Sequence, residues 1–279
     1  SNRIVIALFL TYIFVLLFYS RDEELVEQSL EDEQPIEIIQ SDEDLIDECD
    51  GIDMKWWKSI YISGAFIDLH RLEKTEDIKS ILQDSLTIKK LNLRSSNLQR
   101  LPRELFSFKN LEELDISDNI FVDKNQLFKD LGKLKNLKVL ICRGCKLWNI
   151  PNSITELKNI EALALDRNGL REVNEKIGEL TNLKLLSFRQ NSRLKDLPES
   201  IGKLTCLQEL NMSGAGFIRI RDEVTNCKNL KSIIANASKI KTLPDSIGKL
   251  TELRHLNLGH NKIEVVPKSI GNLKLLEDL

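Results

Sequence analysis

The chain has 279 residues, of which 42% are hydrophobic, 30% are charged and only 6% are aromatic. These proportions are ordinary for a globular protein, and the scarcity of aromatic residues excludes a core built mainly from rings. The five cysteines are sparse and odd in number, which excludes a disulfide framework. The net charge of -3 conceals an asymmetry: residues 22–53 contain fifteen Asp or Glu and no Lys or Arg, whereas residues 54–279 carry a net charge of +10.

An uncharged apolar segment, IVIALFLTYIFVLLFY, occupies residues 4–19. As a helix it would extend about 24 Å, somewhat less than the roughly 30 Å hydrocarbon core of a bilayer. A cleaved secretory signal has this length but requires small residues before the cut, where the chain has Phe18, Tyr19 and Ser20. A membrane anchor is favoured over a signal because Tyr suits the interface, and a buried helix is the third alternative. We therefore expect residues 1–21 to be a signal or a membrane anchor.

The acidic residues 22–53 contain few apolar side chains and one proline, Pro35. Such a segment cannot bury enough apolar area to offset the entropy cost of ordering. We interpret it as a disordered tether. The alternative is that it folds back on the basic remainder of the chain and masks it.

From residue 88 onward the sequence repeats itself with a period of 23 residues. Residues 230–252 and 253–275 both fit the pattern LxxLxLxxNxLxxLPxxIGxLxx, and a ninth copy opens at Leu276. The second copy is three residues longer than the period and the fifth is one residue longer. The other copies begin at Ile88, Leu111, Leu137, Ile160, Leu183 and Leu207. A period of this length is typical of a solenoid, in which neighbouring copies share one core.

Each position of the repeat has a physical interpretation. The LxL stretch alternates with period two, which predicts a short strand with its leucines pointing inward. The Asn that follows can satisfy buried backbone groups of the adjacent coil with its amide; it occurs at Asn119, Asn168, Asn191 and Asn261. Five prolines occupy the same position of the repeat, after the turn Asn, where a fixed φ and a missing N–H suit an irregular backbone segment. They are Pro102, Pro151, Pro198, Pro244 and Pro267. Glycines that relieve crowding or permit a positive φ follow at Gly178, Gly202, Gly248 and Gly271.

Residues 54–87 are expected to form an N-terminal cap, because an open solenoid end exposes core and strand edge. Thr75 followed by two acidic residues is a plausible helix start within this cap. Trp56 and Trp57 can supply apolar cover there, with a ligand platform as the alternative.

The copies resemble the leucine-rich-repeat family in its LPxxIGxLxxL variety, which occurs in bacterial surface and secreted proteins and in intracellular scaffolds. The resemblance covers residues 88–279. It implies an α/β fold: a curved right-handed superhelix with a parallel sheet on the concave side. It also implies recognition of a protein ligand on that concave face, with no catalytic residues and no cofactor.

Strand side chains that point away from the core should contact the ligand. In the central copies they include an apolar group, Val139, Ile141, Ala162, Ala164 and Leu185. Three arginines, Arg143, Arg167 and Arg189, should surround this group, with Arg94 further out. An exposed apolar patch with a charged rim is typical of a protein-binding site. The predicted ligand-binding residues are Val139, Ile141, Arg143, Ala164, Arg167, Leu185 and Arg189.

Other chemistry finds little support in the sequence. Cys142 and Cys145 form a CxxC, but both occupy inward positions of the repeat, and no second pair is present for zinc. No catalytic motif appears, and no basic groove interleaved with aromatic residues favours nucleic acid. We expect a non-enzymatic recognition protein that is membrane-anchored through residues 4–19, or secreted. The alternatives are a cytoplasmic scaffold and the recognition arm of an enzyme whose catalytic domain follows Leu279.

Overall fold

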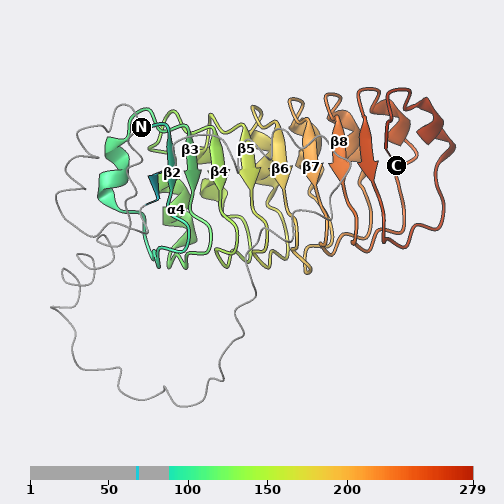
Figure 1. Cartoon of the computed structure of the whole chain (residues 1–279). Helices are drawn as coiled ribbons and strands as arrows, with labels where there is room; N and C mark the ends of the chain where they lie inside the picture. Colours follow the sequence, from blue (N-terminus) through green and yellow to red (C-terminus); the bar gives the residue numbers. More distant parts are fainter. Residues whose placement is uncertain (1–66, 69–87, 279) are drawn as a thin grey trace, which may run out of the picture.

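The computed structural model describes residues 67–68 and 88–278 of the chain (Figure 1). The predicted signal or anchor at residues 1–21, the acidic segment at 22–53 and the Thr75 helix start lie outside the described residues. Within the predicted cap only the backbone of Ile67–Asp68 is described, and it forms the first strand of the sheet.

One sheet of nine parallel strands runs through the described residues, and its strands follow one another in chain order (Figure 1). Eight of these strands come from the repeats, one from each copy, and each is three residues long. The strands are β1 (Ile67–Asp68), β2 (Lys90–Asn92), β3 (Glu113–Asp115), β4 (Val139–Ile141), β5 (Ala162–Ala164), β6 (Leu185–Ser187), β7 (Glu209–Asn211), β8 (Ser232–Ile234) and β9 (His255–Asn257). The predicted leucine-rich-repeat solenoid is therefore confirmed.

The register between strands follows the repeat. Leu140 of β4 pairs with Leu163 of β5, which pairs with Leu186 of β6. Because corresponding residues of successive copies are neighbours, every strand presents the same alternation of inward and outward side chains. A property of one repeat position therefore becomes a row along the whole solenoid.

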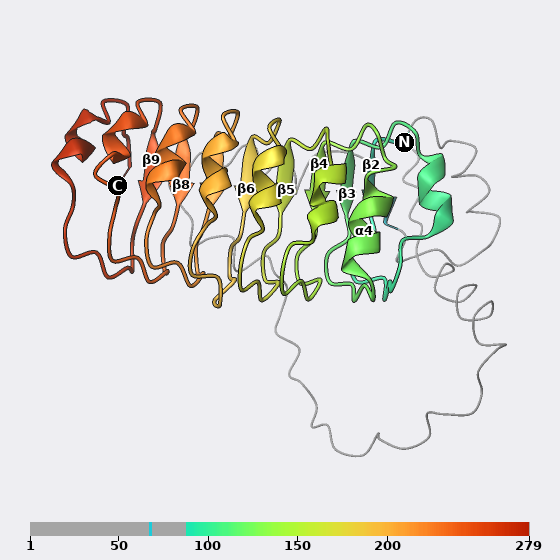
Figure 2. The same cartoon turned by 180° about the vertical axis from the view of Figure 1, so that it is seen from behind.

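Short helical turns lie along one side of the solenoid and cover one face of the sheet (Figure 2). Most are 3-10 turns, and four of them follow directly on a proline of the shared register, whose φ of -62° to -73° leads into the turn. The 3-10 turns are η2 (Arg103–Ser107), η3 (Asn152–Glu156), η4 (Glu175–Glu179), η5 (Glu199–Lys203), η6 (Asp222–Asn226), η7 (Ile247–Lys249) and η8 (Lys268–Asn272).

The longer second copy forms an α-helix in place of a 3-10 turn. Helix α4 spans Lys124–Leu131, and the side chain of its N-cap residue Asp123 accepts a hydrogen bond from the Gln126 N–H at 2.9 Å. Leu127, Phe128 and Leu131 turn into the core. The three additional residues supply the extra turn that an α-helix needs, and a capping Asp stabilises its start.

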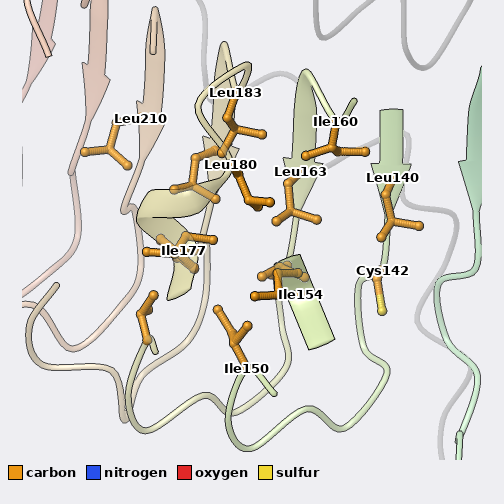
Figure 3. Packing of buried hydrophobic residues seen from close by; sticks show 14 of the residues in the cluster. Leu140, Cys142, Ile150, Ile154, Ile160, Leu163, Ile177, Leu180, Leu183 and Leu210 are labelled. Atoms are coloured by element: carbon orange, nitrogen blue, oxygen red, sulfur yellow. The ribbon is translucent and has the colours of Figure 1, made fainter. Parts of the chain in front are cut away.

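The core lies between the sheet and the helical turns. Leu140, Leu163 and Leu183 are each 3% exposed or less, and the leucines and isoleucines of successive copies pack side by side (Figure 3). Cys142 and Cys145 lie in this core at 0% exposure, as predicted, and burial raises the pKa of the Cys142 thiol. One continuous aliphatic interior therefore joins all the copies.

Three of the four register glycines relieve crowding between coils. A methyl group on Gly178 would lie 2.5 Å from the carbonyl oxygen of Ser200, and one on Gly202 would lie 2.8 Å from that of Glu223. Gly248 approaches Ser269 in the same way, whereas Gly271 has open space around it. None of the four has a positive φ, so close approach of neighbouring coils explains the glycines at the first three positions.

Candidate protein-binding face

The structure brings the predicted apolar residues together. Val139 pairs in register with Ala162 and Ala162 with Leu185, while Ile141 pairs with Ala164. These five side chains form a cluster of their own on the face of the sheet opposite the core. We call them the central cluster: Val139, Ile141, Ala162, Ala164 and Leu185.

The expectation that the central cluster is exposed to solvent is wrong for this structure. Its side chains are between 2% and 9% exposed. Side chains at corresponding positions of parallel strands lie about 4.8 Å apart, so these aliphatic groups contact one another. Neighbouring outward residues are buried as well, including Ser187 at 0% and Ile234 at 6%. The polar and charged side chains that surround the cluster are therefore the accessible part of this face.

Arg143 and Asp166 form an ion pair beside the central cluster. The Arg143 Nε lies 3.1 Å from the Asp166 Oδ2, and the Asp166 side chain is only 5% exposed. The other carboxylate oxygen accepts hydrogen bonds from the Ser187 hydroxyl and from the Arg189 N–H, the latter at 3.1 Å. Burial raises the pKa of Asp166, against the lowering effect of Arg143. This network holds the Arg143 guanidinium at the edge of the cluster.

The other predicted arginines lie on the two following copies. Arg167 is exposed and occupies the left-handed region with a φ of 55°, at the turn that follows β5. Arg189 follows β6 and is partly exposed. Arg94, further toward the N-terminal end, pairs with Asp118 at 2.8 Å. The predicted arginines therefore line the end of the strands at which the coil turns away from the sheet.

A row of alternating charges borders the other end of the strands. Glu112 accepts from Lys89 at 2.9 Å and from Lys138 at 3.0 Å, and Lys184 donates to Glu161 at 2.6 Å. The two lysines lower the pKa of Glu112 by hydrogen bonding to its carboxylate. These ion pairs join neighbouring coils along this border.

Sequence reasoning missed the pairing of charges between copies. The pairs Arg143 with Asp166 and Glu161 with Lys184 are each 23 residues apart, which is the repeat period. In a solenoid with this register, opposite charges at the spacing of the period are neighbours. That spacing was present in the sequence and could have revealed that Arg143 is held by a buried carboxylate.

The described residues contain neither a candidate metal site nor a helix suited to cross a membrane. In residues 67–68 and 88–278 no group of His, Cys, Asp and Glu side chains is arranged to hold a metal ion. No helix in that same part of the chain has the length and apolar character to cross a membrane, and residues 4–19 lie outside it.

Comparison with known proteins identifies the repeats. The family described as "Leucine-rich repeat region" matches residues 91–233, just over half of the chain, and the "Leucine Rich Repeat" family matches residues 252–273. A curated relative, the volume-regulated anion channel subunit LRRC8D of Rattus norvegicus, is 29% identical over 204 residues, which are 72% of this chain and 21% of the relative. The chain thus spans about a fifth of the length of that protein.

Solved structures show the same architecture. A leucine-rich-repeat protein of Leptospira interrogans is 31% identical, with a TM-score of 0.62, over 72% of this chain and 56% of its own. The plant peptide hormone receptor RGFR1, solved in complex with RGF2, is 29% identical, with a TM-score of 0.52, over 69% of this chain and 36% of its own.

Proposed function

Because the chain belongs to the leucine-rich-repeat family, we propose that it is a non-enzymatic recognition protein that binds a protein ligand on the concave face around the central cluster. Domains of this family are generally protein-interaction modules and are typically non-catalytic. The finer statement, which places the ligand at particular residues, rests on the chemistry of this face.

The position of the central cluster is the observation that carries the proposal. Its five aliphatic side chains lie on the side of the sheet that the core does not use. The fold needs no apolar residues there, since the corresponding positions of the first two copies are occupied by Lys90, Asn92, Glu113 and Asp115. An apolar group that the fold does not require is typical of a contact region at the centre of an interface.

The arginines indicate the chemistry of the ligand. Arg167 is exposed, and Arg189 lies on the next copy beside the same cluster. A guanidinium pairs with carboxylates through two parallel hydrogen bonds. The proposed ligand therefore places acidic side chains on Arg167 and Arg189, beside the central cluster. The similar structure of the plant peptide hormone receptor RGFR1 was solved in complex with RGF2, which supports a ligand-binding role for this chain.

A cross-linking experiment tests this proposal. A photoreactive residue is placed at Arg167, and at Lys249 on the opposite side as a control, and covalent partners are identified from the native cells. The captured protein is then purified and titrated against the Arg167→Glu/Arg189→Glu variant. Binding should weaken at least about tenfold, because each reversal removes a paired charge, while Lys203→Glu/Lys249→Glu should bind as the native protein does. Equal affinities would refute the site. Leu185→Asp is unsuitable here because Leu185 is buried.

We further propose that the protein is exported or membrane-tethered through residues 4–19. The support is the uncharged, apolar character of that segment. Protease added to whole cells should then degrade the solenoid, whereas an intracellular scaffold would survive until the cells are broken. The third candidate, the recognition arm of an enzyme, is tested by the coding sequence that follows Leu279.

A further inference from the structure

A second surface of the solenoid lies along the edge where each coil leaves the sheet. It is built from the side chains one and three places after the turn position of each copy, which is held for example by Asn119, Cys145 and Ser238. In the longer fifth copy the second of these places is shifted by one residue and is held by Lys195. Backbone hydrogen bonds join these segments from coil to coil, including Arg171 N to Trp148 O at 3.0 Å and Lys241 N to Ile218 O at 2.9 Å. We call this row the edge ridge; it follows the long edge formed by the loops after the strands (Figure 1).

The edge ridge carries cations that have no acidic partner within the described part of the chain. All of them are exposed, and none forms an ion pair with another residue of 67–68 or 88–278. They are Lys146, Arg171, Lys195, Lys239, Lys241 and Lys262. Glu264 is the one acidic residue at these ridge positions. On the border of the sheet face, by contrast, Lys138 and Lys184 form ion pairs with Glu112 and Glu161. The edge ridge therefore carries a row of six exposed cations and a single acidic residue.

The edge ridge also carries exposed apolar side chains. Ile120 is 54% exposed, Val122 67%, Trp148 58% and Ile218 45%. These are four of the seven large apolar side chains that are exposed in the described part of the chain. The Arg171 guanidinium carbon lies 5.2 Å from the centre of the Trp148 ring. Exposed aromatic and aliphatic groups are thus interspersed with cations along one edge. Exposing such apolar groups to water is unfavourable, so a partner that covers them would be stabilised.

The composition of the ridge discriminates between anionic partners. Five of its six cations are lysines. The lysine ammonium group acts as a point charge, whereas the planar arginine guanidinium binds a carboxylate through two hydrogen bonds. Lysine is depleted in protein–protein interfaces, which disfavours an acidic protein. A nucleic acid strand would meet three aliphatic side chains, Ile120, Val122 and Ile218, that cannot stack on bases. A bilayer surface with anionic headgroups accommodates all three classes, because lysines meet the headgroups while Trp and aliphatic groups enter the interface.

We propose that the edge ridge is a peripheral docking surface for an anionic lipid bilayer, with Trp148 inserted at the level of the headgroups. This proposal goes beyond the binding of a protein ligand and does not depend on it, because the ridge and the central cluster are separate surfaces. Docking along the ridge would leave the concave face free for its ligand.

Trp148 provides a positional test in the full chain. Trp56→Phe and Trp57→Phe leave it as the only tryptophan. The protein is mixed with vesicles of phosphatidylcholine alone, or of phosphatidylcholine with phosphatidylglycerol, each carrying brominated acyl chains. We expect the Trp148 fluorescence to shift to the blue and to be quenched by the mixed vesicles only. Because residues 4–19 could hold the chain on any vesicle, Trp148 quenching rather than co-sedimentation is the deciding measurement.

Charge reversal supplies the matched comparison. On the ridge, the variant Lys239→Glu/Lys241→Glu/Lys262→Glu should raise the lipid concentration needed for half-maximal quenching of Trp148 at least about tenfold. Each surface cation contributes to attraction by anionic lipid. Lys158→Glu/Lys203→Glu/Lys249→Glu makes the same change in net charge at exposed lysines on the other side and should have a much smaller effect.

Any of three fluorescence results would overturn the proposal. Trp148 could stay unquenched while the chain sediments with vesicles, or be quenched equally by zwitterionic vesicles, or respond equally to both triple variants. Zero-length carbodiimide cross-linking of the full chain distinguishes another occupant. Abundant links between ridge lysines and the acids of residues 22–53, retained with anionic vesicles present, would assign the ridge to the chain's own acidic segment and refute lipid docking.

Discussion

The side-chain amide of Asn191 donates a hydrogen bond to the carbonyl oxygen of Leu165, 3.0 Å away in the preceding coil. Its own carbonyl oxygen accepts from the N–H groups of Asn168 and Leu170, at 3.1 and 3.0 Å. The same amide also donates to the Phe188 carbonyl oxygen of its own coil at 2.8 Å, so one buried side chain satisfies backbone groups of two coils. Asn119, Asn168 and Asn261 make equivalent bonds, which confirms the predicted role of the turn asparagine. Where the Asn is replaced, the Cys145 thiol and the Ser238 hydroxyl donate to the same kind of carbonyl.

Replacing Asn191 with Ala should therefore destabilise the solenoid strongly. The side chain is 0% exposed, so its loss leaves several backbone groups unpaired and out of reach of water. We expect the free energy of unfolding to fall by about 2–4 kcal/mol, measured by chemical denaturation. Asn159→Ala is the control, because that exposed amide donates a single bond to Lys135 at 2.8 Å. A loss as small as that of the control would contradict the buried role of Asn191.

Gly178→Ala and Gly271→Ala should differ although they occupy the same position of the repeat. A methyl group at Gly178 would meet the Ser200 carbonyl oxygen at 2.5 Å, whereas nothing lies within 4 Å at Gly271. We expect Gly178→Ala to cost about 1–3 kcal/mol through displacement of the neighbouring coil. Gly271→Ala should be close to neutral. Thermal unfolding of the two variants measures the difference, and equal melting temperatures would show that the coils do not meet at Gly178.

The cysteines should differ in reactivity toward a thiol reagent. Cys142, Cys145 and Cys227 are buried, and burial raises the pKa of Cys142 and raises that of Cys227 to about 12. Only the thiolate reacts, so these three should remain unmodified in the native protein, while exposed Cys206 reacts. The test uses the Cys49→Ser variant, which removes the thiol outside the described residues. With a chromogenic thiol reagent, we expect one fast-reacting thiol in the native variant and four reactive thiols after denaturation. Rapid native modification of Cys142 would indicate an open CxxC.

The stability contributed by Asp166 should decline as pH rises. Burial raises its pKa in the folded state. The contribution is then fully present below the unfolded pKa of about 3.9 and is lost as pH rises through the folded value. The stability of the native protein relative to Asp166→Asn should accordingly be greatest at acidic pH, as measured by denaturant titrations across the range.

Glu112→Gln is the opposite control. Hydrogen bonds from Lys89 and Lys138 lower the pKa of Glu112. Its contribution is present above the unfolded pKa of about 4.3 and is lost as pH falls through the folded value. Slopes of the same sign for Asp166→Asn and Glu112→Gln would contradict these two assignments.

Much of the candidate site followed from the repeat, since the register that joins Val139, Ala162 and Leu185 is the repeat period itself. The burial of these residues did not follow, because exposure depends on which side chains surround an outward position in three dimensions. The pairing of Arg143 with Asp166 corresponds to the 23-residue spacing of the repeat, so the sequence contains the signal for it. The signal or anchor, the acidic tether and most of the cap stay predictions.

The repeat pattern is sufficient to predict that Leu163 and Leu165 face an interior and that Asn191 closes a turn, because a 23-residue period forces equivalent residues into equivalent surroundings. Tertiary structure alone decided that three extra residues become helix α4 and that the central cluster has little contact with solvent. It also decided that unpaired lysines align with Trp148 along one edge. Those outcomes depend on neighbours that are distant in the chain, and the stacking of coils sets the distances between them.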